Sequence, residues 1–331
     1  MSARLTYADV EALRRERGRS TLLFITDRCP VGCAHCSVDS RRDSPTITDF
    51  ELFEEILAWL CGRDGLDVVG ISGGEPFVER RGLSLAARRL TEAGKQLVVY
   101  TSGVWATRAR PPAWIADVLD RSTTVFLSTD AFHAEGIRDE HYVNAARAVA
   151  AAGAWIVVQV IDTEAMVGRA RGLLHAAFGA GWEDFAELHP TAPLTAGRGG
   201  NVFTRSERVP GHAFGPCALV TSPMVRYDGV VTACCNESVI MGWGPERLRR
   251  RARTRAEVEG VVEAFAADPM LRAIGGVGPG ALTAHPRFAE LGGEEFTSIC
   301  DLCWKMLDRS PAEADADPLV EAISTVLVAG R

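Results

Sequence analysis

The segment "TDRCPVGCAHCSVDS", residues 26–40, contains three cysteines within eight residues and no fourth cysteine nearby: Cys29, Cys33 and Cys36. It follows "TLLFIT" (21–26), an apolar run that predicts a β-strand. Where strands alternate with helices, the loops after the strands form the functional edge of the sheet. Three thiolates there can hold a 4Fe-4S cluster and leave one iron open. A zinc site completed by His35 and simple buried thiols are the alternatives.

The composition limits the kinds of partner. The chain has 331 residues and a net charge of -7, so no overall basic field attracts nucleic acid or an anionic membrane. We therefore expect a peptide or small-molecule substrate. The N-terminus has no signal-peptide pattern and no apolar run is long enough to span a bilayer, which predicts a cytoplasmic protein. Reduced thiols are expected there, so the nine cysteines indicate metal ligands or reactive groups before disulfides.

Six β-prone runs alternate with amphipathic segments in the first part of the chain. The runs cover residues 21–26, 67–73, 96–103, 123–130, 154–161 and 186–191. Apolar residues between them recur at helical spacing, for example over 49–60, 83–94 and 139–153. Parallel neighbours need crossover connections, so this alternation predicts an α/β fold with a parallel sheet. Six units are fewer than the eight that close a full barrel.

The pattern changes after residue 191. A stretch rich in Gly and Pro (192–216) is a poor candidate for regular structure, and "MVRYDGVVTACC" (224–235) predicts a hairpin around its Asp-Gly turn. A charged helix is expected over roughly 245–267 and a last helix over roughly 312–328. These elements predict a small C-terminal extension built from a hairpin and helices.

The second predicted strand ends in "ISGGEPF" (71–77), which contains Gly73, Gly74, Glu75 and Pro76. The glycines permit close backbone approach, the carboxylate suits a cationic ligand and the proline fixes the turn. The C-x3-C-x2-C loop after strand one and GGEP after strand two together resemble the radical S-adenosylmethionine (radical SAM) superfamily. The resemblance covers about residues 20–200 and implies a partial (β/α)6 TIM-like barrel with a 4Fe-4S cluster and SAM as cofactors.

The resemblance also implies roles for individual residues. Glu75, with the backbone around Gly73 and Gly74, would receive the SAM amino group, and His35, just before the third cysteine, would lie near the adenine. Ser128 and Asp130 follow the fourth predicted strand, where a hydroxyl and a carboxylate suit the ribose and carboxylate of SAM; the alternative is that they cap the next helix. The cofactors carry the radical chemistry, and the protein orients the substrate and excludes water.

A second set of cysteines follows the barrel region: Cys217, Cys234, Cys300 and Cys303. The order C-x11-G-x4-C and then C-x2-C resembles the start of the SPASM extension and its shortened relative, the twitch domain. This likeness implies one auxiliary 4Fe-4S cluster and a division into a radical SAM barrel (1–200) and an auxiliary cluster domain (201–331). A zinc ribbon with the same four ligands is the alternative.

Cys235 directly follows Cys234. Neighbouring side chains of a strand point to opposite faces, so one thiol can bind the cluster while the other faces the barrel. Radical SAM epimerases quench a substrate radical with such a cysteine, which makes an epimerase of a peptide or sugar precursor the leading interpretation, with the auxiliary cluster helping to restore the thiol.

Three other functions remain open: a twitch-type dehydrogenase of a sugar or cyclitol alcohol, a peptide maturase that forms a crosslink, and a binding module without radical chemistry. For the enzymes, an electron donor such as flavodoxin or ferredoxin is the expected partner.

Overall fold

The computed structural model describes residues 4–204, 207–310 and 317–329. Its core is a nine-stranded sheet in the order β10-β9-β8-β1-β2-β3-β4-β5-β6. Six neighbouring strands are parallel, as the alternating pattern predicts: β1 (Ser20–Phe24), β2 (Val68–Ser72), β3 (Gln96–Thr101), β4 (Thr124–Ser128), β5 (Trp155–Ile161) and β6 (Ala186–Thr191). β1 pairs with β8 on its other side, and no pairing with β6 closes the ring among the described strands. The fold is therefore an α/β partial barrel.

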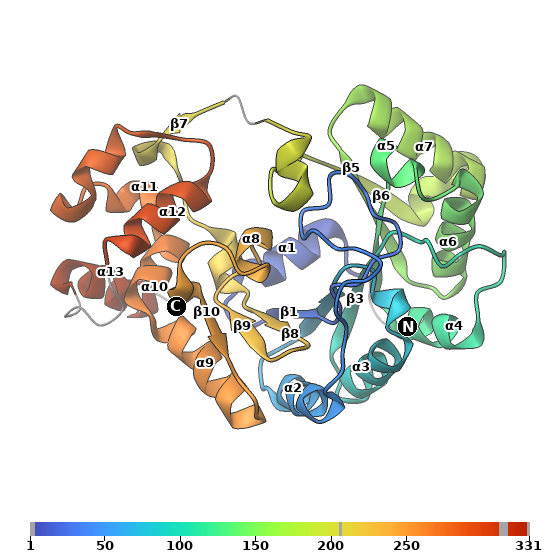
Figure 1. Ribbon diagram of the computed structural model, residues 1–331, viewed down its shortest axis with the longest axis horizontal. Coiled ribbons are helices and arrows are strands. Elements are labelled where there is room, and N and C mark those ends of the chain that lie inside the picture. Colours follow the sequence, from blue (N-terminus) through green and yellow to red (C-terminus); the bar gives the residue numbers. More distant parts are fainter. Residues whose placement is uncertain (1–3, 205–206, 311–316, 330–331) are drawn as a thin grey trace.

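The outer face of this sheet is covered by the helices that connect the strands (Figure 1). They are α2 (Phe50–Gly62), α3 (Arg80–Glu92), α4 (Ala113–Arg121), α6 (Asp139–Ala151) and α7 (Glu164–Phe178), and the short α5 (Ala131–Ala134) follows β4. Caps fix where they begin: the Asp49 carboxylate accepts from Leu52 N (2.9 Å) before α2, and Thr163 does the same for α7. Alternate strand residues such as Val69 and Val99 pack against these helices.

The inner face is partly filled by α1 (Tyr7–Arg15). Val10 of this helix packs with Val98 and Phe126, which alternate with the outward-facing residues of β3 and β4. Tyr7, Glu11 and Arg14 are spaced at helical intervals of four and three, so they share one face of α1. Buried on both faces, the strands are rich in Val, Ile and Leu, as is typical of parallel sheets.

The C-terminal extension continues the same sheet. β8 (Met224–Arg226) and β9 (Val230–Thr232) form the predicted hairpin, and β10 (Arg249–Arg251) pairs antiparallel with β9. The remaining elements are β7 (Val209–Pro210), α8 (Glu237–Ile240), α9 (Arg255–Ala267), α10 (Pro269–Gly276), α11 (Pro279–Leu282), β11 (Glu295–Phe296), α12 (Ile299–Asp308) and α13 (Pro318–Ala329). The helices α9 to α13 lie together on the left of Figure 1.

The helix predicted over 245–267 is wrong in its first part. Residues 249–251 form an edge strand because pairing with β9 overrides the helical pattern of the arginine-rich segment. α9 begins only at Arg255, where the Thr254 hydroxyl accepts from Glu257 N (3.2 Å). The first residues of the predicted last helix, 312–316, lie outside the described part of the chain. Within the described part, no helix is both long and apolar enough to cross a bilayer.

Candidate active site

The cysteines of the N-terminal segment lie on one loop after β1. Cys29 N donates to Arg41 O (2.9 Å), Cys36 N to Cys33 O (3.2 Å), and Ser40 N to Cys36 Sγ (3.3 Å). The three thiols are free, and Cys33 is buried while the other two are partly buried. Burial raises the pKa of the Cys29 thiol to about 12.

Arg198 fixes this loop from a distant part of the chain. Its Nε and Nη2 donate to Cys33 O (3.1 and 2.8 Å), Nη2 also donates to Ser40 O (3.1 Å), and its backbone N donates to Cys36 O (2.9 Å). A side chain on the preceding Gly197 would place Cβ 2.5 Å from Cys36 O. The sequence "TAGRGG" did not reveal this function of Arg198, because it depends on a contact across about 160 residues.

The two glycines of GGEP allow β2 to pack against the same loop. Gly74 N donates to Thr26 O (2.7 Å), and Glu75 N donates to Arg28 O (2.9 Å). A Cβ at Gly73 would lie 2.6 Å from Thr26 O, and one at Gly74 would lie 2.4 Å from Arg28 O. Any other residue would displace one of these backbones. The close approach that the glycines permit is therefore to the backbone of the cysteine loop itself.

The Glu75 side chain is buried and fully hydrogen-bonded. Its carboxylate accepts from Thr101 Oγ1 (2.7 Å), Ser102 Oγ (2.6 Å), Ser102 N (2.9 Å) and Phe77 N (3.2 Å), which follows Pro76 in a short 3-10 turn. Burial raises its pKa, against the effect of these donors. Among the described residues no Lys, Arg or His pairs with this carboxylate, so a ligand ammonium would supply the missing positive charge by replacing a hydroxyl donor.

Asp130 connects two histidines at the end of β4. Its Oδ2 lies 3.0 Å from His35 Nε2, its Oδ1 lies 3.0 Å from His133 Nδ1, and it caps α5 through the amides of Phe132 and His133 (2.9 Å each). Burial lowers the pKa of His133, but interactions with Asp130 and Cys33 outweigh it and raise the pKa to about 10. Both oxygens of Asp130 are thus occupied, and its carboxylate orients His35, which stacks on Phe132 (4.7 Å between ring centroids).

Ser128 is the last residue of β4 and is partly exposed on the same edge. It lines a small cavity together with Ser102, Thr129, His133 and the buried Tyr142. The structure therefore places Ser128 and Glu75's partner Ser102 side by side, which the sequence order alone does not show.

The second cysteine set is assembled from separate segments. Cys300 and Cys303 lie one turn apart on α12, Cys234 follows β9, and Cys217 precedes a 3-10 turn. Burial raises the pKa of Cys303, and the nearby Cys217 and Cys300 raise it further. Burial also raises the pKa of Cys234, with Cys303 and Cys300 again among the causes. The Asn236 side chain donates to Cys300 Sγ (3.4 Å). The fold thus brings these four cysteines together.

Cys235 takes a different direction from Cys234. Arg14 Nη2 donates to its Sγ (3.0 Å), and it packs beside Phe24 and Met224 of β1 and β8. Burial raises the pKa of Cys235, against the effect of Arg14. Burial raises the pKa of Tyr100 on β3 to about 12. The nearby Cys235 raises this pKa further, and the Arg14 guanidinium lowers it. Cys235 therefore lies on the inner side of the sheet, beside α1.

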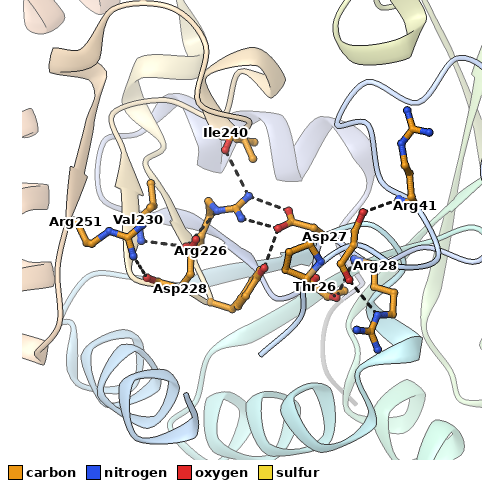
Figure 2. A network of polar contacts seen from close by, with 12 residues as sticks. Thr26, Asp27, Arg28, Arg41, Arg226, Asp228, Val230, Ile240 and Arg251 are labelled. Atoms are coloured by element: carbon orange, nitrogen blue, oxygen red, sulfur yellow. Dashed lines mark hydrogen bonds and ion pairs between the residues drawn. The ribbon is translucent and has the colours of Figure 1, made fainter. Parts of the chain in front are cut away.

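A buried polar contact joins the two halves of the site (Figure 2). Arg226 of β8 donates to both carboxylate oxygens of Asp27 (3.0 and 2.7 Å), and the Tyr227 hydroxyl donates to Asp27 as well (2.8 Å). Arg226 also pairs with Asp228 (3.2 Å). Because Asp27 lies two residues before Cys29, this contact fixes the start of the cysteine loop against the hairpin that leads to Cys234.

Comparison with known proteins identifies the N-terminal region. The family model of the radical SAM superfamily matches residues 23–161, which include both motifs. This region is a radical SAM domain. A search of curated proteins found no match.

Solved structures share the fold of this chain. Streptococcus suis SuiB bound to precursor peptide SuiA is 12% identical, with a TM-score of 0.53 over 86% of this chain and 76% of that one. SuiB bound to S-adenosylmethionine gives 0.51 at 12% identity, covering 86% and 77%. Native anSMEcpe with bound AdoMet and Cp18Cys peptide gives 0.49 at 13% identity, covering 94% and 99%. At 12% identity the likeness to SuiB shows the fold alone.

Proposed function

We propose that this radical SAM chain is an epimerase that inverts a carbon centre in a peptide or sugar precursor. The observation that carries the proposal is the divergence of two adjacent thiols: Cys234 lies with Cys300 and Cys303, and Cys235 lies beside Arg14 on the inner side of the sheet. An enzyme that removes hydrogen from one face of a carbon needs a donor on the other, and a thiol inside the barrel suits that role.

The residues fit the groups that this chemistry requires. Cys29, Cys33 and Cys36 would hold a 4Fe-4S cluster with one open iron, and Glu75 offers a buried carboxylate without a cationic partner to the SAM ammonium. Bound SAM and the reduced cluster supply a 5'-deoxyadenosyl radical. We assign Asp130 a positioning role through His35, because its Oδ2 lies 3.0 Å from His35 Nε2. Ser128 remains available for the ribose.

The second set would hold an auxiliary 4Fe-4S cluster through Cys217, Cys234, Cys300 and Cys303. The burial of Cys217, Cys234 and Cys303, and the influence that these thiols and Cys300 have on one another's pKa, support a shared metal group. The helix α12 contributes its N-terminal end to Cys300, where the positive end of the helix dipole stabilises a thiolate.

The chemical step assigned to this chain occurs at Cys235. Its S–H bond breaks homolytically, the hydrogen atom goes to the substrate carbon on the face opposite to abstraction, and a sulfur-centred radical remains. Burial favours this donor because it raises the pKa of Cys235 and keeps the proton on sulfur. One electron from a reduced flavodoxin or ferredoxin and one proton from water then restore the thiol.

The product mass tests this function. The enzyme would be incubated anaerobically in D2O with SAM, dithionite and an extract of the source cells, and the extract analysed by mass spectrometry. An epimerase replaces one carbon-bound hydrogen of a substrate with deuterium, a mass increase of about one unit with no other change in composition, and Cys235→Ala abolishes that exchange while 5'-deoxyadenosine is still released. A product that has lost two hydrogens would instead identify a dehydrogenase or a crosslinking enzyme.

A further inference from the structure

The sulfurs of the N-terminal cysteine set have hydrogen-bond partners of two kinds. Backbone amides of the same loop donate to Cys29 Sγ, and the amide of Ser40 donates to Cys36 Sγ (3.3 Å). At Cys33 the partner is a side chain, the imidazole of His133. The amides follow from the conformation of the loop itself. A histidine from a segment about 100 residues away is a separate part of the site and calls for an explanation.

The segment of His133 is fixed against the cysteine loop. Asp130 accepts from His133 N (2.9 Å), and its Oδ1 lies 3.0 Å from the ring Nδ1. Gly136, whose amide donates to His133 O (3.0 Å), packs on the same loop. A Cβ at Gly136 would lie 3.0 Å from Cγ1 of Val31 and 3.2 Å from Val31 O. Both the backbone and the ring of His133 are therefore held beside Cys33.

Asp130 decides what the ring can offer to Cys33. Nδ1 of His133 lies against the Asp130 carboxylate, which only accepts hydrogen bonds. The other ring nitrogen is left for Cys33, whose sulfur is also an acceptor when it is a thiolate ligand. A ring between two acceptors can bond to both only by donating from both nitrogens. His133 is thus placed as a donor to a ligand sulfur.

We propose that His133 donates a hydrogen bond to the Cys33 sulfur of the SAM-binding cluster and makes the reduction potential of that cluster less negative. The reduced cluster carries one more negative charge than the oxidised cluster, so a donor on a ligand sulfur stabilises the reduced state. Asp130 acts as a positioning residue for this ring as well. The inference rests on the cluster that the proposed function assigns to the N-terminal cysteine set, and it does not depend on Cys235.

Two other roles of His133 predict different results. A residue that only packs α5 on the loop would affect stability and iron content, but not the potential. A bound metal ion is the second alternative, because ligand atoms of His35, Asp130 and His133 lie within 4.8 Å of one another. Such an ion would bind the lone pair of a ring nitrogen. It would be measured as a second metal besides iron and would be lost from His133→Phe.

A redox titration of the reconstituted protein, followed by electron paramagnetic resonance (EPR), tests the proposal. SAM binds the open iron of one cluster, so the reduced signal that changes on addition of SAM identifies that cluster. In His133→Phe the ratio of reduced to oxidised cluster at a fixed potential should fall about tenfold, which equals about 59 mV for one electron. His133→Gln keeps an N–H donor and should lose less. The matched control is His175→Phe, an exposed histidine on α7, which should leave the ratio unchanged.

The same spectra contain an internal control. A reduced signal that does not respond to SAM should keep its midpoint potential in His133→Phe. An unchanged midpoint of the SAM-responsive signal in His133→Phe, with full iron content, would overturn the proposal. A stoichiometric second metal that is lost with the histidine would also overturn it.

Pulsed EPR of the wild-type protein gives a measurement that does not depend on the folding of a variant. Protein with 15N in the histidine rings should show a nitrogen coupling to the SAM-responsive cluster. The coupling should persist in His35→Phe, because the ring of His35 pairs with Asp130. Absence of the coupling in the wild type, or its loss in His35→Phe, would contradict a hydrogen bond from His133.

The outcomes separate this inference from the proposed function. A wild type that forms no SAM-responsive cluster would overturn both. A normal cluster whose potential does not change in His133→Phe would overturn this inference alone. A lowered potential in His133→Phe, together with a product that has lost two hydrogens, would overturn the epimerase and support the inference.

Discussion

The two cysteine sets are built in opposite ways. The N-terminal set comes from eight consecutive residues, and distant groups such as Arg198 and Gly74 only fix the shape of its loop. The C-terminal set has no local framework, because its cysteines come from segments between residues 217 and 303 that only the fold brings together. The first site therefore depends mainly on its own residues, and the second depends on the packing of the whole extension.

The largest expected effect is at the N-terminal set. Cys33→Ala should abolish formation of 5'-deoxyadenosine, a loss of about a thousandfold or more, because two thiolates cannot hold the SAM-binding cluster. About half of the iron should remain, bound by the C-terminal cysteines. Cys61→Ala on α2 is the control and should retain full activity. Loss of all iron from Cys33→Ala would show that the two sets do not form independent sites.

Arg226→Met should affect both sets through stability. Removing one partner of a buried ion pair leaves Asp27 uncompensated and costs about 3 kcal/mol or more in the free energy of unfolding, measured by urea denaturation. The double variant Asp27→Asn/Arg226→Met should recover part of this loss, because the buried Asp27 charge is gone and the remaining partner, Asp228, is partly exposed to solvent. If the double variant instead loses as much free energy of unfolding as the two single variants together, the pair does not couple the loop to the hairpin.

Glu75→Gln should weaken SAM binding about tenfold or more, because the amide keeps the shape but lacks the charge for the ammonium. The same substitution should increase the free energy of unfolding at neutral pH, although it weakens SAM binding. Burial raises the pKa of Glu75, so the folded state binds more protons than the unfolded state between the usual value of 4.5 and the raised value. Wild-type stability therefore falls relative to Glu75→Gln as pH rises through that window, by about 1.4 kcal/mol per unit of the raised pKa.

Thermal denaturation of the two iron-free proteins at a series of pH values measures this difference. The two proteins should be equally stable at low pH, where Glu75 is protonated. A wild type that gains stability relative to Glu75→Gln as pH rises would contradict the burial argument.

The smallest expected effect is that of Arg198→Lys. Lysine keeps the charge but cannot donate to Cys33 O and Ser40 O at the same time, so about 1 kcal/mol of loop stabilisation is lost. Iron should leave the N-terminal set several times faster in the presence of a chelator, followed by absorbance. Release from the C-terminal set should not change, and an equal acceleration at both sets would remove the distinction between them.

Local patterns in the sequence predicted much of this architecture. The six parallel strands, the hairpin at Asp228-Gly229 and the position of Cys29, Cys33 and Cys36 after β1 follow from periodicity, turn chemistry and strand order. The strand β10 did not, because pairing with β9 decides its structure against the local helical pattern.

The contacts that shape the site could not be predicted from local patterns. The hydrogen bonds of Glu75 with Thr101 and Ser102, the contact of Arg198 with the cysteine loop, and the pair Asp27–Arg226 join residues 26 to 199 positions apart. No local propensity encodes such contacts. The resemblance to a radical SAM enzyme indicated where Glu75 lies, but not which donors surround it.

Iron content of the two adjacent-cysteine variants tests the central claim most directly. Wild type, Cys234→Ala and Cys235→Ala would be reconstituted anaerobically and their iron measured per chain. Two clusters predict about eight irons in the wild type. The account predicts about eight in Cys235→Ala and about four in Cys234→Ala, because only Cys234 lies with Cys300 and Cys303. Loss of four irons from Cys235→Ala, with full iron in Cys234→Ala, would contradict it.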